Sequence, residues 1–413
     1  MTGDTSGTAQ PDEPEQSTGI SRRAALFGGI ASIGVGAAAG VAATRALADS
    51  TTPAPVATAT AAPEGQPVDA AGPEQAGVTR PAVRQAHALI VVGFLDVIDA
   101  AADDAAAHEA IGAALANAGL RILTLCTPPG DDTVTPDGPG DLTITIGLGA
   151  RPLELSDDPS TAEFVAIPMF SGDDALPEAA LSGDVFISVN ATDPGVLDSS
   201  LRAMTEALGG VTLAWSQLSF RGYAAAGDGV SRNPFGYFDG ITVPRTPEDL
   251  ASDVWISSGP LAGGTICVAR RFELDTAAFA ALKLSEQDAV MGRERATGVP
   301  LSGGARDDDI NLLSKSPEGD FLVPARAHAR AAHPSFTGSL LMLRRSYNYV
   351  NSADDVGHVF LSYSINTDAF AKTMVRMEEI DDLFVYMHAT AGGAFAILPG
   401  YDARTPLGAT LFS

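Results

Sequence analysis

The stretch HALIVVGFLDVI, residues 87–98, is followed closely by DDAAAHEAIGAALAN, residues 103–117. The first stretch is an apolar run rich in β-branched residues, which predicts a strand, and the second is an Ala-rich segment that predicts a helix. The same pair recurs in the second half of the chain as GTICVARRFE, residues 264–273, and TAAFAALKLSEQDAVM, residues 276–291. A strand and helix that occur twice in this order indicate two copies of one arrangement.

Each half of the chain continues with the same further elements. In the first half, the pattern predicts a strand, a strand, a helix and a strand at Leu142–Gly149, Val185–Asn190, Gly195–Leu208 and Val211–Phe220. In the second half, it predicts the same series at Gly338–Tyr347, His358–Tyr363, Ala369–Asp382 and Gly393–Leu398. The order β-α-β-β-α-β is that of a ferredoxin-like module. We therefore expect an α+β protein of two ferredoxin-like modules, residues 72–225 and 226–413, whose antiparallel sheets pack around a shared interior.

The residues before this body have the pattern of an export signal. The pair Arg22-Arg23 precedes an uncharged, Gly- and Ala-rich run at 24–44, and Ala-Leu-Ala follows at 46–48 as a cleavage site. This pattern predicts a twin-arginine signal peptide at 1–48, and hence a protein exported to an extracellular, periplasmic or cell-envelope location. An uncleaved membrane anchor is the alternative, because the run is long enough to span a bilayer. Residues 49–71, rich in Thr, Pro and Ala, are predicted to be a disordered linker.

Composition and charge narrow the classes of function. The chain has 413 residues, with 25 Lys and Arg against 51 Asp and Glu, and a formal net charge of −26. A chain this acidic repels phosphate backbones and anionic lipids, so no nucleic-acid partner is expected. The 45% hydrophobic and 18% charged residues are typical of a folded globular protein. Cys126 and Cys267 each lie in an apolar run, and buried thiols are expected there.

Three segments combine polar groups with apolar surroundings. NPFGYFDG, residues 233–240, places an Asp among aromatic and glycine neighbours, although an Asp-Gly pair is also common in ordinary turns. AHARAAHP, residues 327–334, holds two of the six histidines without the Glu or Cys partners of a zinc motif. LMLRRSY, residues 341–347, places two arginines in an apolar strand, and alternation turns one of them inward, where a buried guanidinium needs an anionic partner.

These segments, in this order, resemble the dye-decolourising peroxidase family, a group of haem peroxidases with the same duplicated ferredoxin-like architecture. The G-x-x-D-G motif at 236–240 carries the resemblance together with six shorter stretches: GPEQAG at 72–77, ITIGLG at 144–149, LAGGT at 261–265, MGR at 291–293 with GVPL at 298–301, GGAF at 392–395 and LPG at 398–400. The twin-arginine pattern fits the exported branch of that family, which includes deferrochelatase-like enzymes linked to iron uptake.

The resemblance implies one haem b per chain and a role for five residues. His328 would be the axial ligand of the haem iron, Asp239 the distal acid, and Arg344 the distal arginine and a haem contact. Gly236 and Gly240 would also contact the cofactor. Each role suits its residue type: an imidazole nitrogen binds iron, a carboxylate takes and returns a peroxide proton, and a guanidinium offsets developing negative charge.

The loop around Asp239 departs from the family pattern. Phe238 and Ile241 stand where relatives often carry a lysine and a threonine, so the loop is more apolar than usual. Desolvation in such a loop would raise the pKa of the Asp239 carboxyl. A carboxylate base works only while ionised, and its usual pKa is about 4, so we expect activity to be favoured at acidic pH.

The hydrogen-bond partner of His328 stays open on sequence alone. Relatives often carry an acid where this chain reads FVY at 384–386, and Asp381, Asp382 or a backbone carbonyl could replace it. His333, five residues further on, is a rival ligand for the iron.

The resemblance implies a haem b peroxidase that reduces hydrogen peroxide and oxidises small organic or dye-like donors by one-electron steps. The alternative is a haem-handling protein of an iron-uptake system, with deferrochelatase-like release of iron from haem. A cofactor-free binding module is a third interpretation. The expected partners are hydrogen peroxide and a small reducing substrate, while a homo-oligomer and an association with iron-transport components stay open.

Overall fold

The computed structural model describes residues 65–223 and 230–413, and all of them belong to one compact unit, Ala59–Ser413. The predicted signal peptide and residues 49–64 of the predicted linker lie outside the described residues, as does the predicted module boundary between residues 225 and 226. Ala70, near the end of the predicted linker, is buried in the first hydrophobic core. The packed body therefore begins before residue 72.

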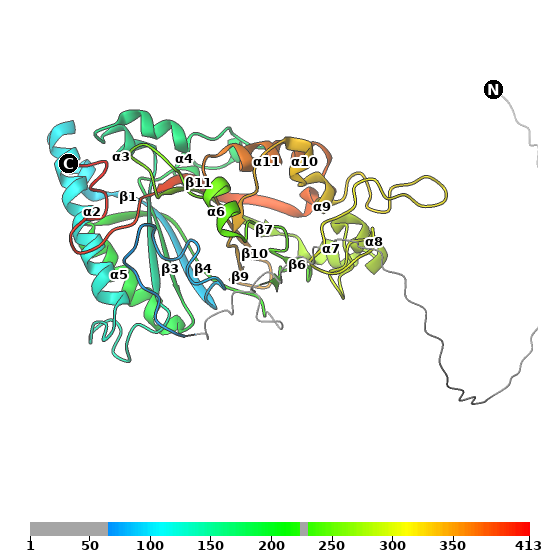
Figure 1. Ribbon diagram of the computed structural model, residues 1–413, viewed down its shortest axis with the longest axis horizontal. Coiled ribbons are helices and arrows are strands. Elements are labelled where there is room, and N and C mark those ends of the chain that lie inside the picture. The colour runs from blue at the N-terminus through cyan, green and yellow to red at the C-terminus, as the bar shows by residue number, and fades with distance from the viewer. Residues whose placement is uncertain (1–64, 224–229) are drawn as a thin grey trace, which may run out of the picture. The chain divides into compact units, whose positions relative to one another are not determined.

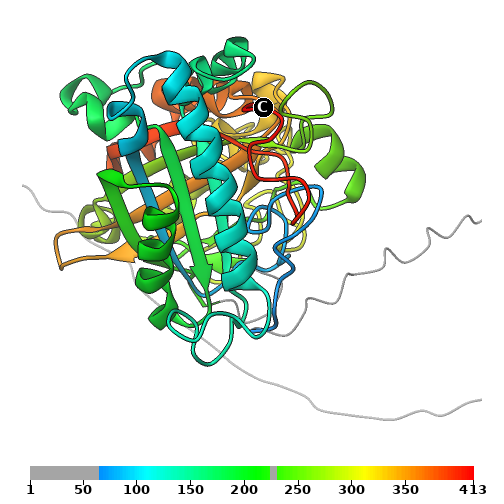
Figure 2. The same ribbon diagram turned by 90° about the vertical axis from the view of Figure 1, so that its left-hand side faces the viewer.

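The first module has the predicted order of elements. Its sheet contains β1 (His87–Leu95), β2 (Thr143–Leu148), β3 (Val185–Ala191) and β4 (Val211–Phe220) in the spatial order β4-β1-β3-β2, with every pair antiparallel. Helices α2 (Asp104–Cys126) and α5 (Leu197–Ala207) cover the outer face of this sheet, as Figure 2 shows. Helix α2 runs past the predicted end at residue 117, because Ile111, Leu115, Ala118, Ile122 and Leu125 continue its buried stripe.

The second module repeats this arrangement. Its strands are β7 (Thr265–Leu274), β8 (Leu343–Arg344), β9 (Tyr347–Val350), β10 (Val356–Ser364) and β11 (Met387–Ile397), in the order β11-β7-β10-β9, and β8 also pairs with β10. This order matches β4-β1-β3-β2 strand for strand. Helix α11 (Asp368–Ile380) occupies the place that α5 has in the first module (Figure 1).

Two predicted elements of the second half are broken. The predicted helix 276–291 is two helices, α7 (Thr276–Ala281) and α8 (Leu284–Met291), because the backbone is extended at Leu282 and Lys283. The predicted strand 338–347 is only β8 and the start of β9, preceded by α10 (Pro334–Thr337). The remaining short elements are α1 (Asp96–Asp99), α3 (Ala150–Glu154), η1 (Pro159–Val165), η2 (Asp173–Ala175), α4 (Glu178–Leu181), η3 (Pro194–Val196), β5 (Ser231–Arg232), β6 (Phe238–Asp239), α6 (Pro247–Asp253), α9 (His328–Ala331) and η4 (Phe384–Tyr386).

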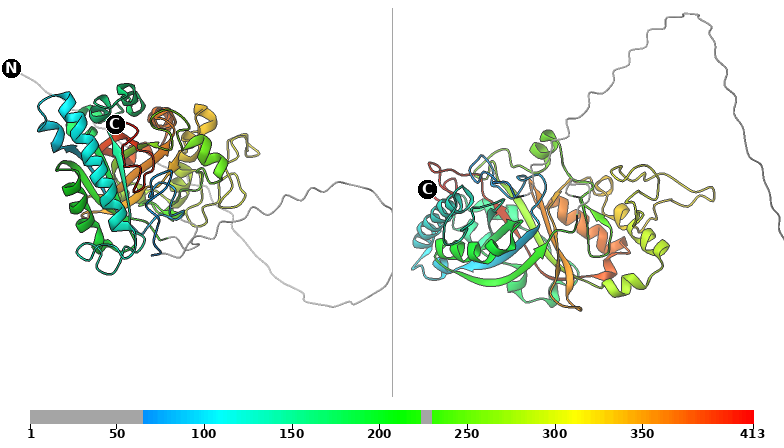
Figure 3. Two further views of the ribbon diagram at one scale, coloured as in Figure 1. Left: turned by 60° about the vertical axis from the view of Figure 1, so that its left-hand side comes forward. Right: turned by 90° about the horizontal axis from the view of Figure 1, so that it is seen from below.

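The two sheets join edge to edge into one closed ring. Strand β2 pairs with β11 through Leu148 and Gly147, and β4 pairs with β9 through the single pair Phe220 and Asn348. Because β7 pairs with both β11 and β10, the nine-stranded sheet has no open end between the modules. The two further views in Figure 3 show the strands between the helices of the two modules. The expected shared interior is therefore enclosed by a continuous sheet.

Three apolar cores follow from this arrangement. The first lies between the first sheet and helices α2 and α5. The second core fills the ring with inward-facing residues of both modules, among them Ile90, Phe186, Val359 and Phe395. The rings of Phe186 and Phe395 stack with their centroids 5.5 Å apart. The third lies on the outer face of the second sheet, between the sheet and α11. Both cysteines are buried, as predicted.

Candidate active site

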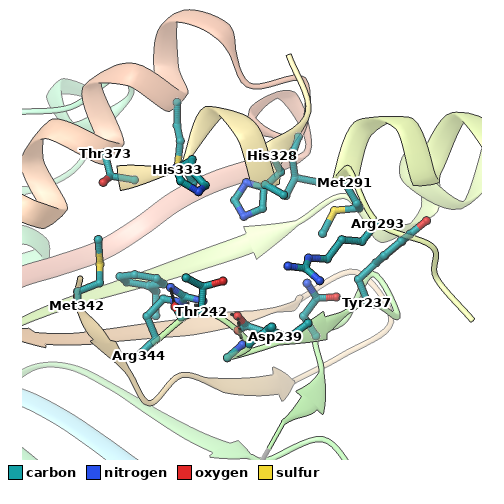
Figure 4. Close-up of a pocket in the computed structure, with 18 of the residues that line it drawn as sticks. Tyr237, Asp239, Thr242, Met291, Arg293, His328, His333, Met342, Arg344 and Thr373 are labelled. Carbon is teal, nitrogen blue, oxygen red and sulfur yellow. Dashed lines mark hydrogen bonds and ion pairs between the residues drawn. The ribbon is translucent and has the colours of Figure 1, made fainter. Parts of the chain in front are cut away.

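A cavity of about 230 Å³ opens beside the third core, where the second sheet meets α9 and α11. Its volume is many times the roughly 10–15 Å³ that a single water needs, so the cavity has room for an organic group. The walls are mostly apolar and include Phe272, Leu274, Met291, Ile310, Phe360, Phe370, Met374, Leu383 and Met387. Figure 4 shows polar side chains on two opposite sides of this space.

His328 lies on one side, at the first position of the short helix α9. Its Nδ1 is 2.7 Å from Oδ2 of Asp381, which directly follows α11 and is fully buried. The carboxylate can only accept, so Nδ1 donates and Nε2 keeps a free lone pair for the cavity. Burial would lower the pKa of the imidazole, but the charge and hydrogen bond of Asp381 outweigh it and the pKa is raised. Asp381 is thus the partner that the sequence left open.

His333 is engaged at both ring nitrogens. Its Nδ1 accepts the backbone N–H of Ser335 at 3.1 Å, and its Nε2 donates to Oδ2 of Asp309 at 2.9 Å. A ligand to iron needs a free nitrogen lone pair, and His333 has none in this arrangement. The structure therefore favours His328 over His333 as the ligand.

Asp239 lies on the opposite side of the cavity, on the two-residue strand β6 (Figure 4). Its Oδ1 accepts the backbone N–H of Gly240 at 2.7 Å and lies 3.7 Å from Nε of Arg344. Arg344 comes from β8 and donates from a terminal nitrogen to the carbonyl of Thr242 at 3.0 Å, so the same guanidinium holds the loop and faces the carboxylate. The structure thus brings the predicted acid and the predicted arginine together.

The electrostatic balance at Asp239 corrects one expectation. Burial raises the pKa of this carboxyl, as the apolar loop suggested, but the charges of Arg344, His358 and Arg84 and the Gly240 N–H act in the other direction. The net result is a pKa below the usual value, whereas the sequence predicted a raised one. The error arose because sequence shows the neighbours of Asp239 along the chain and not the cations that the fold brings to it.

The two predicted glycine contacts have different surroundings. Gly240 lines the cavity, and its φ of +85° is one that a residue with a Cβ rarely adopts. Gly236 is absent from the cavity lining among the described residues, and a Cβ there would meet the side chain of Arg295 at 2.7 Å. Gly240 thus lies beside the cavity and Gly236 does not, and both cofactor contacts stay predictions. Arg345, next to Arg344, is buried and does not line the cavity.

Sequence reasoning missed His358, a third polar group on the side of Asp239. It lies on β10 and lines the cavity, with Nε2 3.6 Å from Oδ2 of Asp239. Burial lowers the pKa of its imidazole to about 4. A histidine inside an apolar strand was the available signal, but only the pairing of β10 with β8 and β9 places it beside the loop of Asp239.

The residues of the cavity fit a haem. A free imidazole nitrogen faces the space from one side, apolar side chains form its walls, and a carboxylate with a guanidinium closes the other side. An axial histidine whose other nitrogen is bonded to a carboxylate is the arrangement that fixes an iron ligand and raises its basicity.

The comparisons with known proteins agree with this geometry. Residues 230–402 match the family model described as Dyp-type peroxidase, C-terminal. The Dye-decolorizing peroxidase of Thermobifida fusca is 30% identical over 237 residues, which cover 53% of this chain and 54% of that protein. The Deferrochelatase of Escherichia coli K12 is 27% identical over 297 residues, which cover 66% of this chain and 69% of that protein. The chain thus matches about half the length of the first of these relatives.

Solved structures extend the similarity over most of the described residues. A structure of DtpA from Streptomyces lividans superposes with a TM-score of 0.74 at 25% identity, and covers 84% of this chain and 98% of that one. The DyP-type peroxidase from Cellulomonas bogoriensis superposes with a TM-score of 0.72 at 26% identity, and covers 85% of this chain and 99% of that one. Through its matched C-terminal region and its duplicated fold, the chain is similar to DyP-type peroxidases.

Proposed function

We propose that this protein is an exported haem b peroxidase that reduces hydrogen peroxide and oxidises small organic or dye-like donors by one-electron steps. The observation that carries the proposal is the pair of groups on opposite sides of one apolar cavity. His328, bonded to Asp381, faces Asp239 and Arg344 across it. This is the set of groups that haem-dependent peroxide reduction needs.

When bound, haem would supply the iron that takes up peroxide and the electrons that break its O–O bond. His328 would hold the iron through Nε2, with Asp381 fixing the tautomer of the ring. Asp239, ionised because its pKa is low, would take the proton of the peroxide and return it to the departing oxygen, which leaves as water. Arg344 would offset the negative charge that develops on that oxygen.

An absorption spectrum of the mature protein, from residue 49 onward, before and after one equivalent of hydrogen peroxide tests this proposal. The unaltered protein should show the spectrum of a histidine-ligated ferric haem that changes rapidly on addition of peroxide. His328→Ala should disturb the ligation, and Asp239→Ala should keep it but slow the reaction. His333→Ala is the matched control in the same cavity and should keep both spectrum and rate. Bound haem that does not react with peroxide would contradict the proposal.

A second candidate function has a specific observation in its favour. Relatives named Deferrochelatase match a longer part of the chain, 66%, than the peroxidase of Thermobifida fusca does, 53%. Release of iron from haem would leave free porphyrin, which fluoresces, whereas peroxidase turnover would leave the haem intact. Incubation with haem under reducing conditions, followed by porphyrin fluorescence and an iron-chelator assay, separates the two functions.

Export by the twin-arginine route is also a proposal, supported by the pattern of residues 22–48. Replacement of both arginines of the pair at 22–23 by lysine should leave the full-length protein inside the cell. N-terminal sequencing of the exported protein should find residue 49 first. A full-length exported chain would instead favour the uncleaved anchor.

A further inference from the structure

His358 is a partly buried histidine beside Asp239 to which the mechanism above gives no task. Its side chain is 13% exposed and lines the same cavity as Asp239 and Arg344. The two oxygens of Asp239 have different neighbours: Oδ1 faces Arg344 and the Gly240 N–H, and Oδ2 faces Nε2 of His358 at 3.6 Å. The histidine therefore occupies the side of the carboxylate that no hydrogen bond takes up among the described residues.

A chain of hydrogen bonds fixes which nitrogen of His358 carries the proton. The amide Nδ2 of Asn348 donates to the carbonyl of Arg232 at 2.9 Å, which sets the orientation of that amide. The Oδ1 of Asn348, 3.0 Å from Nδ1 of His358, must then accept a hydrogen bond from the ring N–H. The two residues are direct partners across β9 and β10, so the sheet register holds this contact in place. Nε2 is left as a bare acceptor that faces Asp239.

The charges around the ring favour its neutral form. Burial is the largest influence and lowers the pKa to about 4; the charge of Asp239 raises it, and the cations of Arg84 and Arg344 lower it again. Above that pH a neutral imidazole faces the carboxylate. An ionised Asp239 cannot donate to a bare nitrogen, and the 3.6 Å gap agrees with the absence of a hydrogen bond in that state.

We propose that His358 is a positioning residue for Asp239, and that the carboxyl and the imidazole hold the peroxide proton between them. The proposal rests on the function proposed above. The O–H bond of hydrogen peroxide breaks, and an O–H bond forms at Oδ2 of Asp239, which donates to Nε2 of His358. The same proton then passes to the departing hydroxide oxygen, which leaves as water. The bound haem would supply the electrons for this cleavage, and the reducing donor would restore them to the haem afterwards.

The chemical reason is that a carboxylic acid needs an acceptor for its own proton in an apolar site. Without His358, the O–H of the protonated Asp239 would have no acceptor among the described residues on that side, and its formation would be less favourable. With His358, the protonated acid is stabilised and oriented until the proton is needed again. A stronger base at the distal side accelerates the first proton transfer.

The first test measures His358 itself, without peroxide chemistry. The protein is labelled with ¹⁵N-histidine and loaded with zinc protoporphyrin, which is diamagnetic, and the six histidines are assigned by single substitutions. We expect the ring of His358 to be protonated at Nδ1 and bare at Nε2 near neutral pH, and to titrate near pH 4. In Asp239→Asn the midpoint should fall, because the neighbouring negative charge is lost. A proton on Nε2, or a midpoint unmoved by Asp239→Asn, would overturn the proposal.

The second test measures the reaction of the haem-loaded protein with peroxide as a function of pH. His358→Leu should lower the rate constant about tenfold or more, since proton transfer to a positioned group contributes about 10²–10⁴-fold in enzymes. His388→Leu, an exposed histidine outside the cavity lining, is the matched control and should not change the rate constant. A His358→Leu protein that matches this control would overturn the proposal.

Asn348→Leu provides an independent variant if His358→Leu fails to fold. It leaves both cavity side chains in place and removes the acceptor of the Nδ1 proton, together with the hydrogen bond from Asn348 to the carbonyl of Arg232. The ¹⁵N spectrum should then show Nε2 protonated in part of the molecules, with a smaller loss of rate. An unreactive unaltered protein would defeat the proposed function, while the ¹⁵N experiment would still decide the state of His358.

Discussion

At the Asp239 carboxyl, burial and charge act in opposite directions, and charge prevails. Arg344 is the largest influence that lowers its pKa. A carboxylate with a lowered pKa stays ionised, and stays a base, to a lower pH than an ordinary one. The rate of the peroxide reaction should therefore fall only below the usual titration range of aspartate, about pH 4. This fall is the acid limb of the pH–rate profile. Activity at acidic pH is expected for this physical reason.

Arg344→Leu should move that limb. Loss of the cation raises the pKa of Asp239, so the rate should begin to fall at a higher pH than in the unaltered protein. The rate at the plateau should also fall by about 10²–10³-fold, because a preorganised donor to the developing charge is lost. Stopped-flow rate constants between pH 3 and 7 measure both quantities. Arg344→Lys keeps the charge and should keep the limb; a limb that moves equally in both variants would show that charge is not the cause.

Some site residues could be predicted from the sequence because they stand in local motifs. Others could not, because they depend on contacts between segments that are distant in the sequence. His328, Asp239 and Arg344 stand in the segments that resemble a known family, so that resemblance pointed to them. Asp381 is 53 residues from His328, and His358 reaches Asp239 only through the pairing of β10 with its neighbours. Contacts of this kind depend on strand register and helix placement, which no local pattern encodes.

At the scale of elements, α9 and α11 build the side of the cavity that carries His328 together. The end of α11 presents Asp381 to the first residue of α9, and the backbone N–H of Leu383 donates to the other oxygen of Asp381 at 2.8 Å. Asp381→Asn keeps the shape of the side chain but removes the negative charge that would make the imidazole of His328 a strong ligand for iron. We expect about 10–100-fold weaker haem binding, the usual effect of losing such a partner.

Competition of the protein with apomyoglobin for haem measures this loss of affinity. Asp382→Asn is the matched control, because Asp382 is the neighbouring acid, is exposed, and pairs with Arg326 at 2.5 Å instead of with the histidine. The control should bind haem like the unaltered protein. Equal losses in the two variants would mean that Asp381 acts only through the general charge of this surface.

A buried ion pair ties η2, in the first half of the chain, to β7 in the second. Arg270 and Asp173 are 1% and 2% exposed, and the guanidinium donates to both carboxylate oxygens at 2.5 and 3.0 Å. Asp173→Asn would leave the guanidinium buried without a counter-charge, and we expect a loss of about 3–5 kcal/mol in the free energy of unfolding. Asp198→Asn breaks the exposed pair with Arg202 and should cost about 0.5 kcal/mol or less. Urea denaturation of both variants tests the difference.

The elements themselves were predictable to different degrees for a related reason. Strands with a continuous apolar or an alternating pattern, such as β1, β3 and β4, are found within a few residues of their predicted bounds. The predicted strand 338–347 is reduced to β8 and the start of β9, because residues 339–342 line the cavity instead of joining the sheet. Deviations from the regular repeat thus concentrate where the second module builds its site.

At the scale of the whole molecule, the ring is closed by very few pairings. The two seams between modules contain two residue pairs at β2 and β11 and one at β4 and β9. Pairings this short leave no pattern in the sequence, so the duplication could be predicted but not the closure of the sheet. The interior of the ring, in contrast, is one apolar core with residues from both modules. Stability should therefore be shared across the seams through this core.

Two tryptophans make that sharing measurable, because Trp215 lies on β4 of the first module and Trp255 lies just before β7 of the second. In the Trp255→Phe protein, the fluorescence of Trp215 reports the first module, and in the Trp215→Phe protein, the fluorescence of Trp255 reports the second. We expect the same urea midpoint from both proteins. Phe186→Ala, added to either background, removes a first-module ring stacked on Phe395 of the second and should cost about 3–5 kcal/mol.

The decisive point is where the loss caused by Phe186→Ala appears. Because Phe186 belongs to the shared interior, both tryptophans should report it to the same extent, although only Trp215 is in the same module. Phe164→Ala removes a ring that is 39% exposed and should shift either midpoint much less. A loss reported by Trp215 alone would mean that the modules unfold independently and that the ring is held by packing within each module. A common shift would identify the interior of the closed sheet as the unit that folds.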